Sequence, residues 1–237
     1  MAAIIRISNL SKTYYMAGDV AVKALDDVSL EIQKGAFIIT MGPSGSGKST
    51  LMQILGGLDR PTSGKVNVDG YSIHELDEFG IAIYRRKKIG FVFQSFNLLP
   101  NMTALENVAL PLRLNGVSRK ERLKKAARLL SQVGLDDRMH HKPTELSGGQ
   151  QQRIAIARAL ANDPPIILAD EPTGNLDSVS GELVMDILED LNRNGHTIFV
   201  VTHDPRMARY ANQVIRMFDG RIASNDQQDP SYHGKDG

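Results

Sequence analysis

A glycine-rich run that ends in a lysine and a serine is the first feature of this sequence that could do chemistry. It reads Gly42-Pro43-Ser44-Gly45-Ser46-Gly47-Lys48-Ser49 and fits the pattern G-x-x-x-x-G-K-[ST]. In that pattern glycines let backbone N–H groups turn toward phosphate oxygens, and the start of the following helix adds partial positive charge. The run therefore predicts a phosphate site, in which Lys48 reaches the β- and γ-phosphates of ATP and the Ser49 hydroxyl ligates Mg²⁺. We count the next residue, Thr50, among the nucleotide contacts.

Two adjacent carboxylates, Asp170 and Glu171, end an apolar run at 166–169. Neighbouring strand residues point to opposite faces, so the two side chains must have different tasks. In a strand parallel to the one before the phosphate loop, Asp170 would lie near the metal and bind it directly or through water. Glu171 would then be free to orient and polarise the attacking water. An acidic pair alone is also typical of a helix start; beside a phosphate loop it predicts ATP hydrolysis.

A second turn suited to anions reads Leu146-Ser147-Gly148-Gly149-Gln150 and precedes a helical pattern. Ser147 is a good N-cap residue, and the two glycines expose backbone N–H groups at the helix start. One chain thus carries two turns that could each hold a γ-phosphate. The residues alone leave open whether both contact the same nucleotide.

Composition limits the classes of protein that can carry these turns. The chain has 237 residues, 41% of them hydrophobic and 23% charged, which is typical of a globular protein. Its formal net charge of +1 lacks the basic excess of nucleic-acid-binding proteins, so we expect no nucleic-acid partner. The absence of cysteine excludes disulfides and thiolate metal sites. No apolar run reaches the ~18 residues of a membrane span and residues 1–10 lack a signal-peptide pattern, so we expect chain and ATP to meet in the cytosol.

Alternating strand and helix patterns must position these residues. Strands are predicted at 4–7, 28–32, 37–41, 65–68, 89–93, 166–169, 197–201, 214–218 and 221–224. Helices are predicted at 48–55, from a capping box at Thr103, from Ser118 to Gly134, at 150–161 and at 179–192. Pro111 should bend or shorten the second of these helices.

The predicted fold class is α/β. It combines a P-loop NTPase core, whose mixed sheet has a parallel centre and an N-terminal antiparallel part, with an inserted helical subdomain. We assign residues 1–93 and 162–224 to the ATP-binding core and residues 94–161 to the helical subdomain that carries the Ser147 turn. The polar tail at 225–237 is expected to be disordered.

The phosphate loop, the Ser147 turn and the acidic pair together resemble the nucleotide-binding subunit of ABC transporters. Other marks of that family are matched over about residues 4–224. They are its adenine-stacking aromatic, glutamine loop, D-loop and switch histidine, at Tyr14, Gln94, Asn175-Leu176-Asp177 and His203. For the aromatic, the neighbouring Tyr15 is an alternative to Tyr14.

The resemblance implies a head-to-tail homodimer, in which each ATP lies between the phosphate loop of one subunit and residues 147–150 of the other. It also implies that Gln94 contacts Mg²⁺ and the attacking water and senses a membrane partner. His203 would contact the γ-phosphate, and Asp177 would cross the dimer interface. Tyr14 would stack on the adenine, a contact worth ~1–3 kcal/mol per base.

Stretches at 57–64, 89–94, 98–100, 103–108 and 170–177 resemble the subgroup that powers macrolide exporters and lipoprotein-releasing systems. In the lipoprotein-releasing relatives the signature often ends in glutamate, so Gln150 weakens that assignment. Fused macrolide exporters continue into a permease, whereas this sequence ends at Gly237. The resemblance therefore implies a separate transmembrane permease, with this chain bound peripherally at the cytoplasmic face of the inner membrane.

The expected docking place is the cleft beside Gln94, where the run at 96–102 would supply apolar side chains; packing inside the helical subdomain is the alternative for that run. The expected function is ATP-driven export or extraction of an amphiphilic cargo, such as a macrolide, peptide or lipoprotein. A mechanical regulator of the cell-division type, which acts through a permease-like partner without moving cargo, is the second hypothesis. A soluble ABC ATPase of DNA repair or translation is disfavoured, because paired cassettes and long coiled-coil or zinc insertions are not seen.

Overall fold

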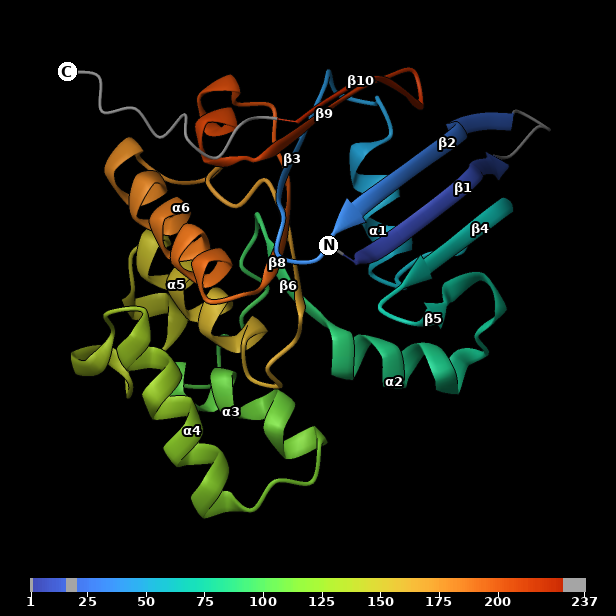
Figure 1. Ribbon diagram of the computed structural model, residues 1–237. Helices are drawn as coiled ribbons and strands as arrows, with labels where there is room; N and C mark the ends of the chain where they lie inside the picture. The colour runs from blue at the N-terminus through green and yellow to red at the C-terminus, as the bar shows by residue number, and fades with distance from the viewer. Residues whose placement is uncertain (1, 16–20, 228–237) are drawn as a thin grey trace.

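The computed structural model describes residues 2–15 and 21–227 (Figure 1). The strands are β1 (Ala3–Tyr15), β2 (Ala21–Gln33), β3 (Phe37–Met41), β4 (Ser63–Val68), β5 (Tyr71–Ser72), β6 (Ile89–Phe93), β7 (Ile166–Asp170), β8 (Thr197–Val201), β9 (Gln213–Phe218) and β10 (Arg221–Gln227). The α-helices are α1 (Lys48–Leu55), α2 (Glu78–Lys88), α3 (Ala104–Leu114), α4 (Arg119–Gln132), α5 (Gly148–Ala159) and α6 (Ser178–Arg193).

A six-stranded sheet with the order β10-β9-β3-β8-β7-β6 forms the centre of the molecule. Its strands run parallel except β10, which pairs antiparallel with β9. Every residue of β3 and β8 is buried, because helices and a second sheet cover both faces. Burial on both faces explains why these strands read as continuous apolar runs rather than alternating ones.

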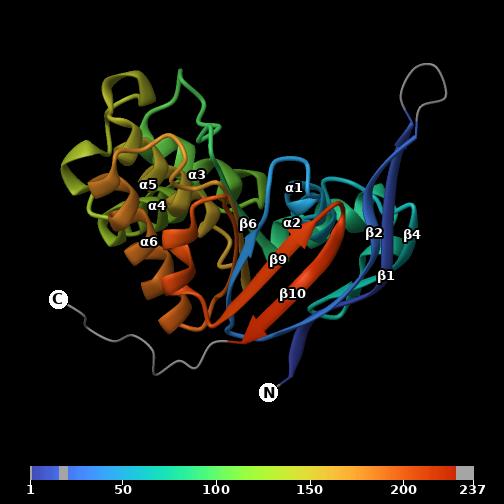
Figure 2. The same ribbon diagram turned by 90° about the horizontal axis from the view of Figure 1, so that it is seen from above.

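The N-terminal part of the chain forms a separate antiparallel sheet with the order β2-β1-β4-β5. Helix α1 lies between the two sheets, and α3 to α6 lie on the opposite face of the six-stranded sheet (Figure 2). Each face has its own buried apolar cluster. The predicted α/β class with a mixed sheet is confirmed.

Two aspartate–glycine pairs form the tight turns that the sequence indicates. Asp69 and Gly70 have φ angles of 44° and 83° and join β4 to β5. Asp219 and Gly220, at 46° and 76°, join β9 to β10. Positive φ at both central residues gives the twist that neighbouring antiparallel strands need.

Several features of the chain differ from the sequence-based expectations. Strands β1 and β2 extend well beyond the predicted 4–7 and 28–32. Helix α3 runs through Pro111 to Leu114, because its capping box and buried face stabilise it despite the missing donor. Helix α2 was not predicted, since only Ile81 and Tyr84 of its residues are buried and its periodicity is weak. Strand β10 extends to Gln227, where pairing with β9 orders three residues of the expected tail at 225–237. The rest of that tail, 228–237, lies outside the described residues, and the division at 94–161 stays a prediction.

Candidate active site

The predicted site residues follow the carboxyl ends of parallel strands, at one edge of the six-stranded sheet. The phosphate loop follows β3, Gln94 follows β6 and Glu171 follows β7. His203 comes two residues after the end of β8. The register pairs Phe93 with Asp170 and Asp170 with Val201, so the last residues of β6, β7 and β8 lie side by side. This edge is where open α/β sheets bind ligands.

The phosphate loop is held in a shape that its glycines alone allow. Gly42 has a φ of 153°, and an added Cβ there would lie 2.1 Å from the Met217 carbonyl oxygen. Gly47 has a φ of 96°, and its Cβ would lie 2.4 Å from the Ala24 carbonyl oxygen. The backbone of the loop is therefore packed against β9 and β2, with its conformation fixed before any ligand arrives.

The Lys48 side chain lies inside the loop. Its Nζ donates to the carbonyl oxygens of Gly42 and Pro43, both at 2.8 Å, and lies 3.3 Å from Ser46 Oγ. Burial lowers the pKa of Lys48, while the negative charges of Glu171 and Asp170 act in the opposite direction. The ammonium is thus already placed where phosphate oxygens would be bound.

The residues near this loop fit a magnesium ion that is shared with phosphates. Ser49 Oγ donates to Asp170 Oδ1 at 3.3 Å, so a hydroxyl and a carboxylate, both hard oxygen ligands, are adjacent. Burial raises the pKa of Asp170, which indicates a carboxylate that gains from a nearby cation. Within the described residues, no three histidine or acidic side chains are grouped as a complete metal site. Phosphate oxygens and water would supply the remaining ligands.

Glu171 is held in an unusual conformation by the end of β8. Its φ of 46° lies in the left-handed region, which non-glycine residues rarely adopt and which clusters at functional sites. Thr202 Oγ1 donates to Glu171 Oε2 at 3.2 Å, and His203 Nδ1 lies 2.9 Å from Oε1. The His203 side chain is 73% exposed, whereas that of Glu171 is 18% exposed. Thr202 was missed by the sequence analysis, although it stands between a buried strand and His203.

Gln94 is linked to the loop that follows Glu171. Its Nε2 donates to Asn175 Oδ1 at 3.3 Å, and Asn175 Nδ2 donates back to the Gln94 carbonyl oxygen at 3.0 Å. An added Cβ at Gly174 would lie 2.7 Å from Gln94 Nε2, so the two segments are in close contact. The predicted contact of Gln94 with Mg²⁺ stays a prediction.

A pocket of about 640 Å³ opens at the phosphate loop, lined by Val22, Lys23, Ala24, residues 44–50, Glu171 and His203. The turn at 147–150 does not contribute to this lining. Ser147 caps α5, as predicted, and its Oγ accepts from the Gln150 N–H at 3.3 Å. Asp177 caps α6 and accepts from the Ser180 N–H at 2.9 Å. Neither helix start contributes to the pocket at the phosphate loop.

Tyr14, rather than Tyr15, is the cross-strand neighbour of a residue that lines this pocket. Tyr14 pairs across the sheet with Val22, one of the lining residues, and its hydroxyl donates to Asp59 Oδ2 at 2.6 Å. Lys12 Nζ lies 4.7 Å from the centre of the Tyr14 ring. Tyr15 is 77% exposed. The stacking role of Tyr14 stays a prediction.

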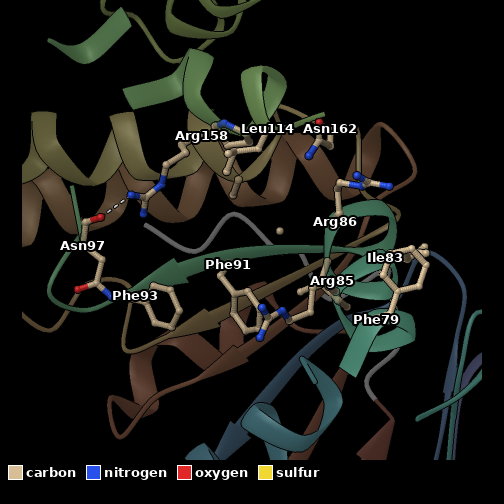
Figure 3. Close-up of a pocket in the computed structure, with 15 residues that line it drawn as sticks. Phe79, Ile83, Arg85, Arg86, Phe91, Phe93, Asn97, Leu114, Arg158 and Asn162 are labelled. Carbon is tan, nitrogen blue, oxygen red and sulfur yellow. Dashed lines mark hydrogen bonds between the residues drawn. The ribbon is translucent and has the colours of Figure 1, made fainter. Parts of the chain in front are cut away.

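A second cleft, of about 710 Å³, opens between α2, β6 and the end of α3 (Figure 3). Its apolar walls include Phe79, Ile83, Phe91, Phe93 and Leu114. The expected apolar run at 96–102 contributes only Asn97 to the lining, because Leu98 instead packs against the core beside α3. The apolar side chains of this cleft thus come mainly from α2 and β6, and a contact of the run at 96–102 with a permease stays a prediction.

Comparisons with known proteins agree with this geometry. A family model described as "ABC transporter" matches residues 25–174. An uncharacterized ABC transporter ATP-binding protein of Thermotoga maritima is 53% identical over 222 residues, which cover 94% of each chain. A macrolide export ATP-binding/permease protein MacB of Hyphomonas neptunium is 52% identical over 90% of this chain. The match covers 33% of that relative's own length.

Solved structures give the same result. The dimeric structure of a post-hydrolysis state of the ATP-binding cassette MJ0796, bound to ADP and Pi, matches with a TM-score of 0.87 at 49% identity. The match covers 94% of this chain and 98% of that one. A relative of the same name in Methanocaldococcus jannaschii is 52% identical to this chain over 224 residues. No helix in the described part of this chain is long and apolar enough to cross a membrane.

Proposed function

This chain belongs to the ABC transporter family of ATP-binding proteins, and from that premise we propose that it is the ATP-hydrolysing motor of an export complex, acting as a pair of identical subunits. Family membership makes it an ATPase that binds ATP with Mg²⁺. The pairing, the permease and the cargo are the proposed part.

Each residue at the sheet edge has a task in this proposal. The loop backbone and Lys48 bind the phosphates, with the ammonium moving from the Gly42 and Pro43 carbonyl oxygens to phosphate oxygens. When bound, Mg²⁺ at Ser49 and Asp170 neutralises charge on the phosphates. Glu171 orients and polarises the water that attacks the γ-phosphate, and Thr202 fixes its carboxylate. His203, exposed beside Glu171, is free to turn to the γ-phosphate.

One observation carries the proposed pairing: the chain has a second turn suited to anions that lies outside its own nucleotide pocket. Backbone N–H groups of Gly148 and Gly149 start α5 behind the Ser147 cap, and none of these residues lines the pocket at the phosphate loop. A head-to-tail dimer gives this turn a ligand, because the turn of each chain then completes the pocket of the other. The proposal is supported by the cassette MJ0796, which has the same fold and whose solved structure is dimeric.

Mixing two inactive variants tests this arrangement. Lys48→Ala disables the phosphate loop, and Ser147→Asp keeps a good N-cap residue but places a negative charge beside the γ-phosphate. Each variant alone should lose ATPase activity. Their mixture should regain a clear fraction of it, because a mixed dimer contains one pocket built from an intact loop and an intact turn. Activity that stays at the level of the separate variants, with both still folded by thermal denaturation, would show that each site is complete within one chain.

We propose that the permease docks in the cleft between α2, β6 and α3. Aromatic and aliphatic side chains line its walls, and Phe79 and Leu114 are each 73% exposed. Arg85 and Arg86 lie at the α2 side, while Arg158 donates to the backbone oxygens of Phe96 and Asn97 at the other side (Figure 3). Among the residues that the structure describes, none that lines the cleft is acidic. A short apolar segment that carries a carboxylate therefore fits it best.

Charge reversal tests the docking cleft. The double variant Arg85→Glu, Arg86→Glu should retain at most about a fifth of the normal copurification with the proposed permease, because like charges would meet in the cleft. Lys87→Glu is the matched control, since Lys87 is exposed on the same helix turn but does not line the cleft. Retention should be measured in detergent at low ionic strength. An equal loss of copurification in both variants would show that overall charge, and not this cleft, determines the binding of the permease.

The proposed cargo is inferred from the names of the relatives, not from the residues of this chain's own site. Relatives at about 50% identity are named macrolide export proteins, and we infer that this motor also drives outward movement of an amphiphilic molecule. The chain then works peripherally, at the cytoplasmic face of the cell membrane. A flux assay with the reconstituted complex and a macrolide tests this; ATP hydrolysis without any flux of amphiphile would favour a purely mechanical role.

A further inference from the structure

The segment at 57–64 follows α1 and has no task in the mechanism above, yet it lies beside Tyr14. Of the side chains in this segment, that of Asp59 makes the most hydrogen bonds. One carboxylate oxygen, Oδ2, accepts from the Tyr14 hydroxyl at 2.6 Å. The other, Oδ1, accepts from Lys12 Nζ at 2.6 Å and from the Arg60 N–H at 2.7 Å. Lys12 Nζ also donates to the Arg60 carbonyl oxygen at 2.8 Å.

This cluster is well defined because it is partly shielded from solvent. The side chains of Lys12 and Asp59 are 12% and 25% exposed. Burial alone would raise the pKa of Asp59, but the hydrogen bonds from Lys12 and Tyr14 outweigh it and hold that pKa below its usual range. The carboxylate is therefore charged at neutral pH and stays bonded to both partners.

The same segment ties the Tyr14 strand to the helix of the phosphate loop. The N–H groups of Leu58 and Asp59 both donate to the Gln53 carbonyl oxygen in α1, at 2.8 and 3.3 Å. Thr62 makes two hydrogen bonds with the end of β1. Its N–H donates to the Ser11 carbonyl oxygen at 2.9 Å, and its Oγ1 accepts from the Thr13 N–H at 3.0 Å. Helix α1 has eight residues and is about 12 Å long. The segment therefore fixes how far Tyr14 stands from Lys48 at the other end of that helix.

We propose that Asp59 is a positioning residue for the purine of ATP: it holds the Tyr14 ring, with Lys12 over one face, so that the other face is presented to the base. This inference rests on the proposed nucleotide site. Two pocket residues adjoin the ring, since Val22 is the cross-strand partner of Tyr14 and Thr50 is close enough to affect the pKa of the Tyr14 hydroxyl. Asp59 itself lines no part of the pocket and acts through Tyr14.

A ring that is already fixed loses little rotational freedom when a base stacks on it. Without Asp59, the Tyr14 ring must be ordered by the nucleotide itself. The phosphate subsite is built from residues 42–50 and would be unaffected. The effect of Asp59 should therefore appear in binding of ATP and be absent from binding of a phosphate chain without a base.

Two probes, ATP and inorganic triphosphate, separate these effects. We expect Asp59→Ala to weaken the Kd for ATP by about five- to tenfold, within the range of one base stack, and to leave the Kd for triphosphate unchanged within about twofold. Tyr14→Phe keeps the ring but removes the hydroxyl, and should weaken ATP binding in the same way. In a Tyr14→Leu background, Asp59→Ala should cause no further loss of ATP affinity. Calorimetry on the intact chain measures each of these Kd values.

The chain offers a matched control in Asp69, which pairs with Lys88 at 2.5 Å while Lys88 Nζ lies 5.7 Å from the Tyr71 ring. That cluster is outside the nucleotide pocket, so Asp69→Ala should change neither Kd. Three results would each overturn the inference. Asp59→Ala could weaken binding of ATP and of triphosphate equally, or it could leave the Kd for ATP unchanged. It could also weaken ATP binding as much in the Tyr14→Leu background as in the wild type. A wild-type chain that bound neither probe would overturn the proposed function as well. If Asp59→Ala does not fold, Tyr14→Phe alone decides.

Discussion

Replacing Glu171 by glutamine should reduce ATP turnover by about 10²–10⁴-fold while ATP binding is preserved, because the change removes a general base but keeps the size of the side chain. Glutamine can still bond the Thr202 hydroxyl that contacts Glu171 Oε2 at 3.2 Å, so the left-handed backbone at residue 171 should survive. No part of the phosphate loop changes. Steady-state phosphate release and equilibrium binding of ATP measure the two quantities separately.

The same variant should also accumulate as an ATP-bound dimer, because in the proposed shared pocket the two chains would separate only after hydrolysis. Sedimentation of Glu171→Gln with and without Mg-ATP should therefore show a shift from one chain to two. Glu31→Gln is a suitable control, because Glu31 is exposed on β2. A Glu171→Gln protein that hydrolyses ATP normally, or that stays monomeric with saturating ATP, would contradict both the assigned base and the shared pocket.

The elements that carry the chemistry were predictable because local and tertiary signals agree there. Strands β3, β6 and β8 and helix α1 have the predicted bounds. In β3 and β8 burial on both faces gives continuous apolar runs, and in α1 the glycines of the loop mark the start and Gly56 the end. The parallel register that brings Asp170 level with Phe93 and Val201 joins strands that are separated by the long connections at 94–165 and 171–196. The sequence indicates these strands and helices only as alternating elements, not their register.

The contacts around the site were less predictable, because they depend on side chains that meet only after folding. Asp59 bonds Tyr14 and Asn175 bonds Gln94 across long stretches of chain, and neither partner has a spacing that would reveal it. The cleft that Phe79 lines was not predictable, because the amphipathic pattern of α2 is too weak to show that Phe79 faces outward. Sequence patterns thus predict which backbone turns bind phosphate more readily than which side chains support them.

Replacing Lys48 by alanine should nearly abolish nucleotide binding, with a loss of about 10²–10⁴-fold in affinity. The ammonium now bonds two loop carbonyl oxygens at 2.8 Å and would exchange them for phosphate oxygens. Hydrogen bonds to charged groups contribute about 1.5–3 kcal/mol each, so two lost contacts are equivalent to about 3–6 kcal/mol. Equilibrium dialysis with Mg-ATP measures the loss.

A matched lysine separates this local effect from a general loss of positive charge. Lys65 is exposed on β4, so Lys65→Ala should leave ATP affinity unchanged within about twofold if only local contacts count. The carbonyl oxygens of Gly42 and Pro43 lose a donor in Lys48→Ala, and thermal unfolding without nucleotide shows whether the loop survives that loss. Because added ATP stabilises only a chain that binds it, the melting temperature should rise with ATP in Lys65→Ala and stay constant in Lys48→Ala. An undiminished ATP affinity in folded Lys48→Ala would exclude the phosphate loop as the binding site, and the shared-pocket dimer would have no nucleotide to enclose.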